Sequence, residues 1–296
     1  MPARERPLAA QSKQLGTDAG SAAPPSELRA REDERRLAQS GRLEAEQVRQ
    51  MFDRVAGVYD VLNTTMTAGL HRRWRERAAD FVHVGPGGKV LDVATGTGDL
   101  ALVLARRVWP GGEVVASDFS PAMLARAKAK AAAASGALVT PRFEWADAMQ
   151  LPYQDDAFDA ATVGFGARNF SDLQRGLAEM ARVVRPGGRV VVLEITSPTG
   201  RSLLAVFLAV WFDRVVPRLG RLVEALAGGP WRARAREREG ISAAYAYLPS
   251  SVKRFPSPHG LAAEMARAGL GDIRYVLTAG GIIAIHAGTV CAEANA

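Results

Sequence analysis

A glycine-rich turn over residues 92–99 carries the clearest chemical signal in this sequence of 296 residues. The turn reads Asp-Val-Ala-Thr-Gly-Thr-Gly-Asp and follows a short apolar run that is typical of a buried strand. Gly96 and Gly98 permit positive φ and let the backbone approach a ligand closely. Asp118 ends the next predicted strand, where its carboxylate is placed to accept hydrogen bonds from ribose hydroxyls.

Three interpretations of this turn remain open from the spacing. The pattern Gly96-x-Gly98-x-x-Ala101 satisfies the fingerprint of a dinucleotide-binding (NAD) turn, in which the helix N-terminus receives a pyrophosphate. The alternative is the nucleoside pocket of an S-adenosylmethionine (SAM) methyltransferase, and the third is an ordinary tight turn. The SAM interpretation is favoured because Asp92 would obstruct a phosphate but suits a cationic methionine group. Asp147, after a third strand, is placed to bind an adenine amino group.

Alternating strands and helices position these residues. Strands are predicted over residues 89–94, 113–118, 142–145, 158–163 and 189–195, and helices over residues 100–108, 121–134 and 172–184. This βαβ alternation indicates an α/β fold with a mostly parallel, doubly wound sheet. A helix over residues 258–268 then precedes two apolar runs, 273–279 and 282–287. A Gly-Gly pair separates these runs, which predicts a C-terminal antiparallel hairpin.

Two helices are predicted before the first strand, and we expect them to form a lid over the pocket. The first begins near residue 44 and carries an amphipathic stripe of Val48, Met51, Phe52 and Val55. The second covers residues 69–82. Residues 1–44, rich in small, polar and charged residues, are predicted to be a disordered tail, with an organellar transit peptide as the alternative. The expected catalytic domain is therefore residues 45–296.

Several segments resemble known families. The acidic strand ends and the Arg-Pro-Gly-Gly turn at residues 185–188 are similar to the class I SAM-dependent methyltransferase series. More specific segments resemble the quinone-biosynthesis C-methyltransferases, the family of demethylmenaquinone methyltransferase and 2-polyprenyl-6-methoxy-benzoquinol methylase. These segments are residues 48–53, 59–63, 69–75, 165–169, 245–248, 255–256 and 280–286. The resemblance covers about residues 46–288 and implies a Rossmann-like class I fold with SAM as cofactor.

The resemblance also implies a reaction, the C-methylation of a prenylated quinol in respiratory quinone biosynthesis. Demethylmenaquinol is the first expected substrate, and the benzoquinol of ubiquinone biosynthesis is the alternative. Arg168 is implied as the catalytic residue with Asn169 in support, since a guanidinium facing the donor can stabilise a phenolate directly or through water. An arginine is itself a poor base. Asp99 is expected to cap the helix that follows it.

The remaining site residues are expected in two groups. The substrate and lid residues are Tyr59, Asn63, His71 and His286, with core packing or structural hydrogen bonding as the alternative roles. At Gly164 some relatives carry a serine that contacts the cofactor, so this contact is the least supported of the set. The expected cofactor-binding residues are Asp92, Thr95, Gly96, Thr97, Gly98, Asp118, Phe119, Asp147, Ala148 and Gly164.

Composition limits the alternatives. A single cysteine and four scattered histidines argue against a disulfide framework and a metal site. No apolar run reaches the roughly 20 residues that span a bilayer, and no secretory signal begins the chain, which predicts a cytoplasmic protein. The net charge is +7, and residues 201–240 carry eight arginines against four acidic residues beside an apolar run.

This distribution of charge bears on partners. The basic, apolar segment suggests peripheral contact with anionic lipid at the inner face of the cell membrane. A second copy of the chain, in a homodimer, is a further candidate partner. A nucleic-acid-binding module is the alternative from another class, but the sequence resembles no base-reading motif, so no nucleic acid is expected.

Overall fold

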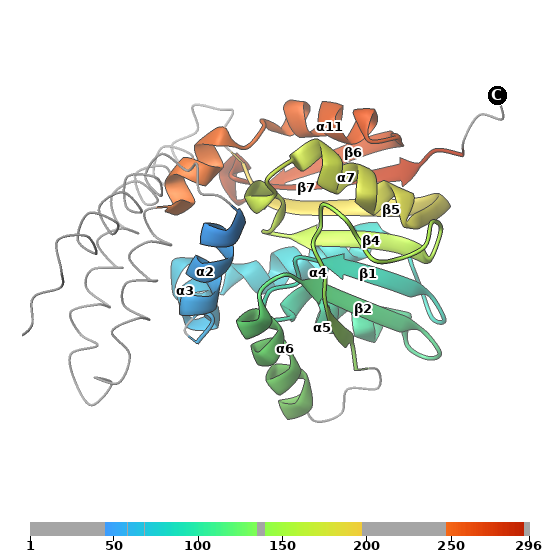
Figure 1. Cartoon of the computed structure of the whole chain (residues 1–296). Helices are drawn as coiled ribbons and strands as arrows, with labels where there is room; N and C mark the ends of the chain where they lie inside the picture. The colour runs from blue at the N-terminus through green and yellow to red at the C-terminus, as the bar shows by residue number, and fades with distance from the viewer. Residues whose placement is uncertain (1–44, 58, 68, 135–139, 197–246, 293–296) are drawn as a thin grey trace, which may run out of the picture.

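The computed structural model describes residues 45–57, 59–67, 69–134, 140–196 and 247–292. A seven-stranded sheet in the order β3-β2-β1-β4-β5-β7-β6 forms its centre (Figure 1). The first five strands in sequence run parallel, and β7 is antiparallel to both β5 and β6. The strands are β1 (Lys89–Val93), β2 (Glu113–Asp118), β3 (Arg142–Trp145), β4 (Phe158–Gly164), β5 (Val184–Ile195), β6 (Leu270–Thr278) and β7 (Ile283–Val290).

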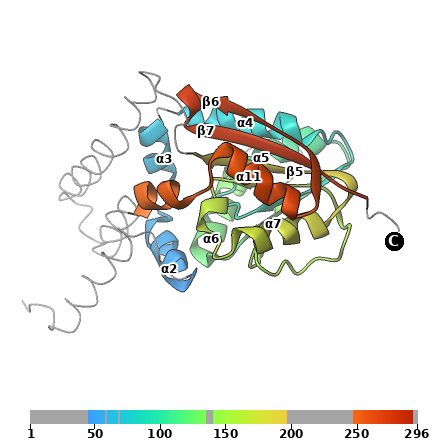
Figure 2. The same ribbon diagram turned by 90° about the horizontal axis from the view of Figure 1, so that it is seen from above.

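Helices cover both faces of the sheet because its central strands are apolar on both sides. Val90 packs with α4 (Leu70–Val82) and α5 (Asp99–Val108) on one face. Its neighbour Leu91 packs with α7 (Leu173–Arg182) and α11 (Pro258–Arg267) on the other. Figure 2 separates these two layers. The predicted α/β fold with a mostly parallel sheet is confirmed. It could be predicted because a strand that is buried on both faces reads as a continuous apolar run in the sequence.

The N-terminal helices α2 (Ala45–Val55) and α3 (Tyr59–Thr67) stand at the edge of the sheet where the parallel strands end (Figure 1). The predicted apolar stripe of α2 is confirmed: Val48, Met51 and Val55 are buried, and Val55 packs with Met123 of α6 (Pro121–Ala133). α3 was not separated from its neighbours by the sequence pattern. A further helix over residues 247–254 was not predicted either.

The observed bounds differ most from the predicted ones at the start of β5. β5 begins at Val184 rather than at Arg189, because the strand pairs with β4 on both sides of the Arg-Pro-Gly-Gly turn, with a register shift there. The predicted hairpin is confirmed as β6 and β7, although its turn is a 3₁₀ turn over Ala279–Gly281 in which Gly280 and Gly281 have positive φ. β7 pairs with β5, so the hairpin extends the parallel sheet.

Two predictions, the disordered tail over residues 1–44 and the apolar, basic segment over residues 201–240, lie outside the described residues. Within the part of the chain that is described, no helix is both long enough and apolar enough to cross a membrane.

Candidate active site

The carboxyl ends of β1, β2 and β4 open into a cavity, which we call the strand-end cavity. It lies where open α/β sheets bind ligands. The structure therefore brings most of the predicted cofactor residues to one place. Those in its wall are Asp92, Thr95, Gly96, Thr97, Asp118, Phe119, Asp147, Ala148 and Gly164, and they are joined by Asn169 and Tyr59.

Gly98 was predicted to bind the cofactor, but it lies beneath the loop and not in the wall of the cavity. Its φ is +83°, and a Cβ atom there would lie 3.0 Å from the Phe143 ring and 3.2 Å from Ala127 Cβ. Only glycine combines this backbone with such close packing. Asp99 was expected from the sequence to cap α5, but it does not. Its carboxylate instead accepts a hydrogen bond of 2.7 Å from Lys130 Nζ.

The Asp92 carboxylate is almost fully buried at the end of β1. Its two oxygens accept hydrogen bonds of 2.6 Å from the hydroxyls of Thr95 and Thr162. Burial raises the pKa of Asp92 to about 6, although these hydrogen bonds oppose the shift. An acidic group held in this way favours a cationic partner, because a positive charge restores the ionised form.

Asp118 holds the two loops of the strand-end cavity together. Its carboxylate accepts hydrogen bonds of 2.8 Å from the backbone N–H of Gly96 and from that of Ser120. Burial raises its pKa to about 6. Asp147 is exposed and accepts a hydrogen bond of 2.9 Å from the Met149 N–H. In both residues the carboxylate already orders its own loop, whatever further bonds a ligand adds.

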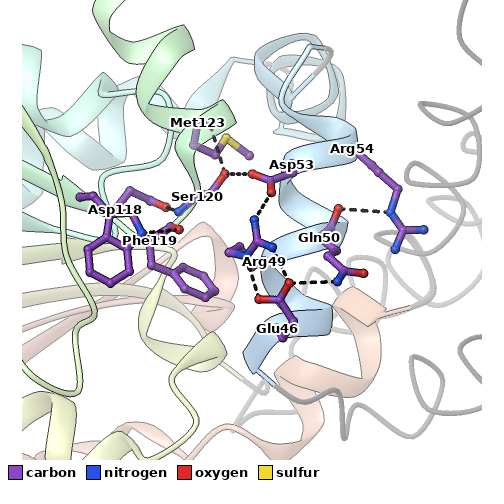
Figure 3. Close-up of polar contacts among 10 residues, drawn as sticks. Glu46, Arg49, Gln50, Asp53, Arg54, Asp118, Phe119, Ser120 and Met123 are labelled. Carbon is purple, nitrogen blue, oxygen red and sulfur yellow. Dashed lines mark hydrogen bonds and ion pairs between the residues drawn. The ribbon is translucent and has the colours of Figure 1, made fainter.

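Acidic side chains tie α2 and α3, which stand at the mouth of this cavity, to its loops, and the role of Asp53 was not predicted. The second helix expected in the lid, residues 69–82, is α4 and packs on a face of the sheet instead. Asp53 of α2 accepts a hydrogen bond of 2.5 Å from the hydroxyl of Ser120, which also caps α6 and neighbours Asp118 (Figure 3). Arg49 donates to the second oxygen of Asp53, at 2.7 Å. On α3, Asp60 accepts a hydrogen bond of 2.6 Å from the Thr97 hydroxyl. The two helices therefore bind both loops at the mouth of the cavity.

A second cavity adjoins the first, and we call it the apolar cavity. Its wall comes from α2, α3, α4, the helix over residues 247–254 and the edge of the sheet, and it includes the predicted residues Asn63, His71 and Arg168. Most of the wall is aliphatic or aromatic. The two cavities share the side chains of Phe52, Tyr59, Arg75 and Phe165. A ligand in one cavity can therefore meet a ligand in the other across this shared wall.

Arg168 lies in a 3₁₀ turn after β4 and is buried, with 8% of its side chain exposed. It lines the apolar cavity, whereas its neighbour Asn169 lines the strand-end cavity. Arg168 Nη1 donates to Glu194 Oε1 at 2.6 Å and to the Phe165 carbonyl at 2.7 Å. Burial opposes its charge, but the carboxylate of Glu194 outweighs burial and raises the pKa of Arg168. Arg168 therefore acts as a fixed cation and not as a base.

Glu194 was not predicted as a site residue. It is 1% exposed in β5 and also accepts hydrogen bonds from the backbone N–H groups of Arg168 and Ile195. A single carboxylate inside the β-branched run of this strand is the signal that identifies it in the sequence. Within the described part of the chain, Arg168 Nε and Asn169 Oδ1 are buried without a hydrogen-bond partner. Such atoms are uncommon in folded proteins.

The structure brings one of the two predicted histidines, His71, to the cavities and leaves the other, His286, apart from them. His71 is buried in the wall of the apolar cavity, where it accepts a hydrogen bond from Arg75 through Nδ1 and contacts the Thr64 hydroxyl at 3.3 Å through Nε2. Burial and the charge of Arg75 lower its pKa to about 4, so it is neutral. His286 was wrongly expected at the site. It is fully buried in β7, donates to the Pro258 carbonyl at 2.9 Å, and lines neither cavity.

Comparison with known proteins gives consistent results. Residues 40–290 match the ubiE/COQ5 methyltransferase family. The demethylmenaquinone methyltransferase of Thermus thermophilus is 45% identical over 238 residues, covering 80% of this chain and 99% of the relative. The ubiquinone/menaquinone biosynthesis C-methyltransferase UbiE of Geobacter sulfurreducens is 39% identical over 254 residues, covering 86% and 90%. A SAM-dependent methyltransferase of Aquifex aeolicus superposes with a TM-score of 0.50 at 17% identity, covering 73% of this chain and 89% of that one.

Proposed function

The chain belongs to the ubiE/COQ5 methyltransferase family, and we propose that it methylates a ring carbon of demethylmenaquinol, with SAM as the methyl donor. Family membership makes it a SAM-dependent methyltransferase and rejects the dinucleotide interpretation of its glycine-rich turn. The observation that carries the proposal is the pair of cavities. One is lined by acidic strand ends and the other by apolar side chains, and they meet at one shared wall.

The strand-end cavity fits SAM by the chemistry of its wall. The residues proposed to hold the cofactor are Asp118 for the ribose hydroxyls, Asp147 for the adenine amino group and Asp92 for the cationic methionine part. Asn169 Oδ1, buried in this wall without a partner, offers one further acceptor. SAM, when bound, supplies an electrophilic methyl group on a sulfonium.

The apolar cavity is proposed to hold the quinol ring. A ring carbon becomes nucleophilic when the neighbouring phenol loses its proton, so the site must stabilise a phenolate. Arg168 carries a permanent charge at the wall of this cavity, and its Nε has no hydrogen-bond partner among the described residues. The guanidinium is therefore proposed to lower the pKa of the phenol, so that the proton leaves to water. After methyl transfer, the proton on the methylated ring carbon leaves to water and the ring oxygen is protonated again, which restores the aromatic quinol. Tyr59 and Phe165, in the shared wall, orient the ring and exclude water from the donor side.

The test is a reaction of the purified protein with SAM that carries a deuterated methyl group. Demethylmenaquinol and the demethylated benzoquinol precursor of ubiquinone are supplied separately, and mass spectrometry detects the labelled product. We expect the label in menaquinol, as the name of the Thermus thermophilus relative suggests. The Geobacter sulfurreducens relative is named for both pathways, which keeps the benzoquinol as the second candidate. Label in neither product would refute the proposal.

We further propose that the protein works in the cytoplasm at the inner face of the cell membrane, because a prenylated quinol resides in lipid. The basic residues 201–240 support this proposal through their sequence alone. Partition onto liposomes that contain anionic lipid should fall when four of these arginines are replaced by glutamine, and partition that does not change would contradict it. The four positions are Arg232, Arg234, Arg236 and Arg238.

A further inference from the structure

We propose that Arg75 binds the carboxylate of the cofactor's methionine part, a role that rests on the use of SAM by this protein. Arg75 belongs to α4, is 6% exposed, and is one of the four side chains in the wall shared by the two cavities. Its guanidinium thus borders the site proposed for the cofactor from α4. The inference depends on the charge and the hydrogen bonds of this side chain.

Arg75 is a buried cation without an anion in hydrogen-bond contact. Among the described residues, the nearest carboxylate oxygen is Oδ2 of Asp99, at 3.6 Å from Nη1. That carboxylate already accepts a hydrogen bond of 2.7 Å from Lys130 Nζ, so its charge is shared between two cations. A buried charge left in this state is unfavourable, and an anionic ligand would offset the cost.

The other contacts of Arg75 are with neutral groups and use one side of its guanidinium. Nη1 donates to Nδ1 and to the carbonyl of His71, and Cζ lies 5.4 Å from the centre of the Phe165 ring. Because an arginine can only donate, this contact makes Nδ1 of His71 the acceptor, and the lowered pKa of His71 keeps the ring neutral. Nε and Nη2 have no hydrogen-bond partner among the described residues. This pair of donors matches a carboxylate in the bidentate geometry that arginine favours.

The wall of the strand-end cavity also carries the negative charge that complements the ammonium group of an amino acid. Asp92 and Arg75 both line the strand-end cavity. They are not in direct ion-pair contact in the described part of the chain, although the charge of Arg75 acts to lower the pKa of Asp92. Asp92 is acidic and Arg75 is basic, so the pair complements a zwitterion, with the ammonium toward Asp92 and the carboxylate toward Arg75. The quinol has no carboxylate, and its phenolate is proposed to face Arg168, a second cation in the wall of the apolar cavity.

The test compares SAM with decarboxylated SAM, which lacks only the carboxylate, by calorimetry on the full chain. In Arg75→Gln we expect the affinity for SAM to fall about 10- to 100-fold, the range for losing a hydrogen bond to a charged group. The affinity for decarboxylated SAM should stay unchanged or rise, since that ligand has no anion to lose its partner and one repulsive cation is gone. Its binding also shows that the variant is folded.

Two variants serve as controls. Arg73→Gln removes the same charge from an exposed position of the same helix and should change both affinities by less than twofold. Arg75→Lys keeps the charge but not the fork, so it should recover part of the preference for SAM. If Arg75→Gln does not fold, this variant decides: a preference for SAM equal to that of the unmodified protein would contradict the proposal.

Other outcomes would overturn the inference about Arg75, and they can be distinguished from a failure of the proposed function. An equal loss of affinity for both ligands in Arg75→Gln would mean that Arg75 acts through packing. An unchanged affinity for SAM with a raised KM for the quinol would assign Arg75 to the acceptor. If the unmodified protein bound neither ligand, the failure would be that of the SAM-dependent function itself.

Discussion

Replacing Asp92 with asparagine is predicted to make the protein more stable and a weaker binder of its cofactor. The pKa of Asp92 is about 6 in the folded protein against an ordinary value of 3.8, because the carboxyl is buried. Folding therefore favours the protonated form: its stabilising contribution is complete below pH 3.8 and is lost as the pH rises through 6. A shift of about two units in the pKa of Asp92 lowers the free energy of unfolding by roughly 3 kcal/mol at pH 8. About 2 kcal/mol of this loss develops between pH 4.5 and pH 8.

Asparagine has nearly the same shape, and its amide can still bond the hydroxyls of Thr95 and Thr162. The free energy of unfolding of Asp92→Asn, relative to the unmodified protein, should therefore increase by about 2 kcal/mol from pH 4.5 to pH 8. Urea unfolding at pH 4.5, 6 and 8 measures this change, and any constant effect of the substitution cancels from it. Asp272→Asn, the same exchange at an exposed position, should stay within about 0.5 kcal/mol at each pH.

The binding measurements run in the opposite direction. The affinity of the unmodified protein for SAM should rise between pH 5 and pH 7, as Asp92 ionises to meet the cationic ligand, and this rise should be smaller in Asp92→Asn. At pH 8 the variant should bind SAM at least tenfold more weakly, the equivalent of about 1.4 kcal/mol. A variant whose relative stability is the same at every pH would refute the argument from burial. One that binds SAM normally would refute the proposed contact.

Three further substitutions test other parts of the site. Gly98→Ala should lower the free energy of unfolding by about 2 to 4 kcal/mol, since alanine is strained at this positive φ and its Cβ would lie 3.0 Å from a ring carbon. The control Gly69→Ala, at a positive φ with open space around it, should lower the same free energy by about 1 kcal/mol in the same urea titration. Glu194→Gln weakens the contact that positions the Arg168 guanidinium, so it should lower kcat about 10- to 100-fold with the Kd for SAM within twofold; an unchanged kcat would remove the pair from the mechanism. Asp53→Asn weakens the bond between α2 and the loop after β2, so stopped-flow measurements should show SAM dissociating several-fold faster, and an unchanged rate would mean that α2 does not retain the ligand.

The strand-end cavity could be predicted from the sequence because consecutive residues encode it. Each parallel strand ends at the same edge of the sheet, so finding the strands also places Asp92, Asp118 and Asp147 together. The glycines were harder to assign, because the pattern of Gly96 and Gly98 is the same whether a glycine faces a ligand or, as at Gly98, packs under the loop against Phe143.

The contacts between distant segments were not predictable in the same way. Asp53 and Ser120 are 67 positions apart, and no local pattern says that the hydroxyl that caps α6 also binds a lid helix. His286 was misplaced for a related reason. A motif resemblance brings a residue to a strand but does not say which face of that strand it occupies, and here Pro258 of α11 covers it. The register of a strand, and with it the face of the sheet that each side chain occupies, is set by tertiary pairing, here by the pairing of β7 with β5.

Phe165 shows why the shared wall depends on the whole fold and not on one motif. Its φ is +62°, a conformation that costs a residue other than glycine of order 1 kcal/mol. The surrounding contacts hold it there: its N–H donates to the Leu193 carbonyl at 2.8 Å, its own carbonyl accepts from Arg168, and its ring packs on Trp74 and Arg75. The strained backbone of Phe165 thus directs its ring between the two cavities, and its carbonyl oxygen positions the guanidinium of Arg168. Phe165 contributes both to the wall shared by the two cavities and to the position of Arg168, so a change that relaxed this backbone would disturb both at once.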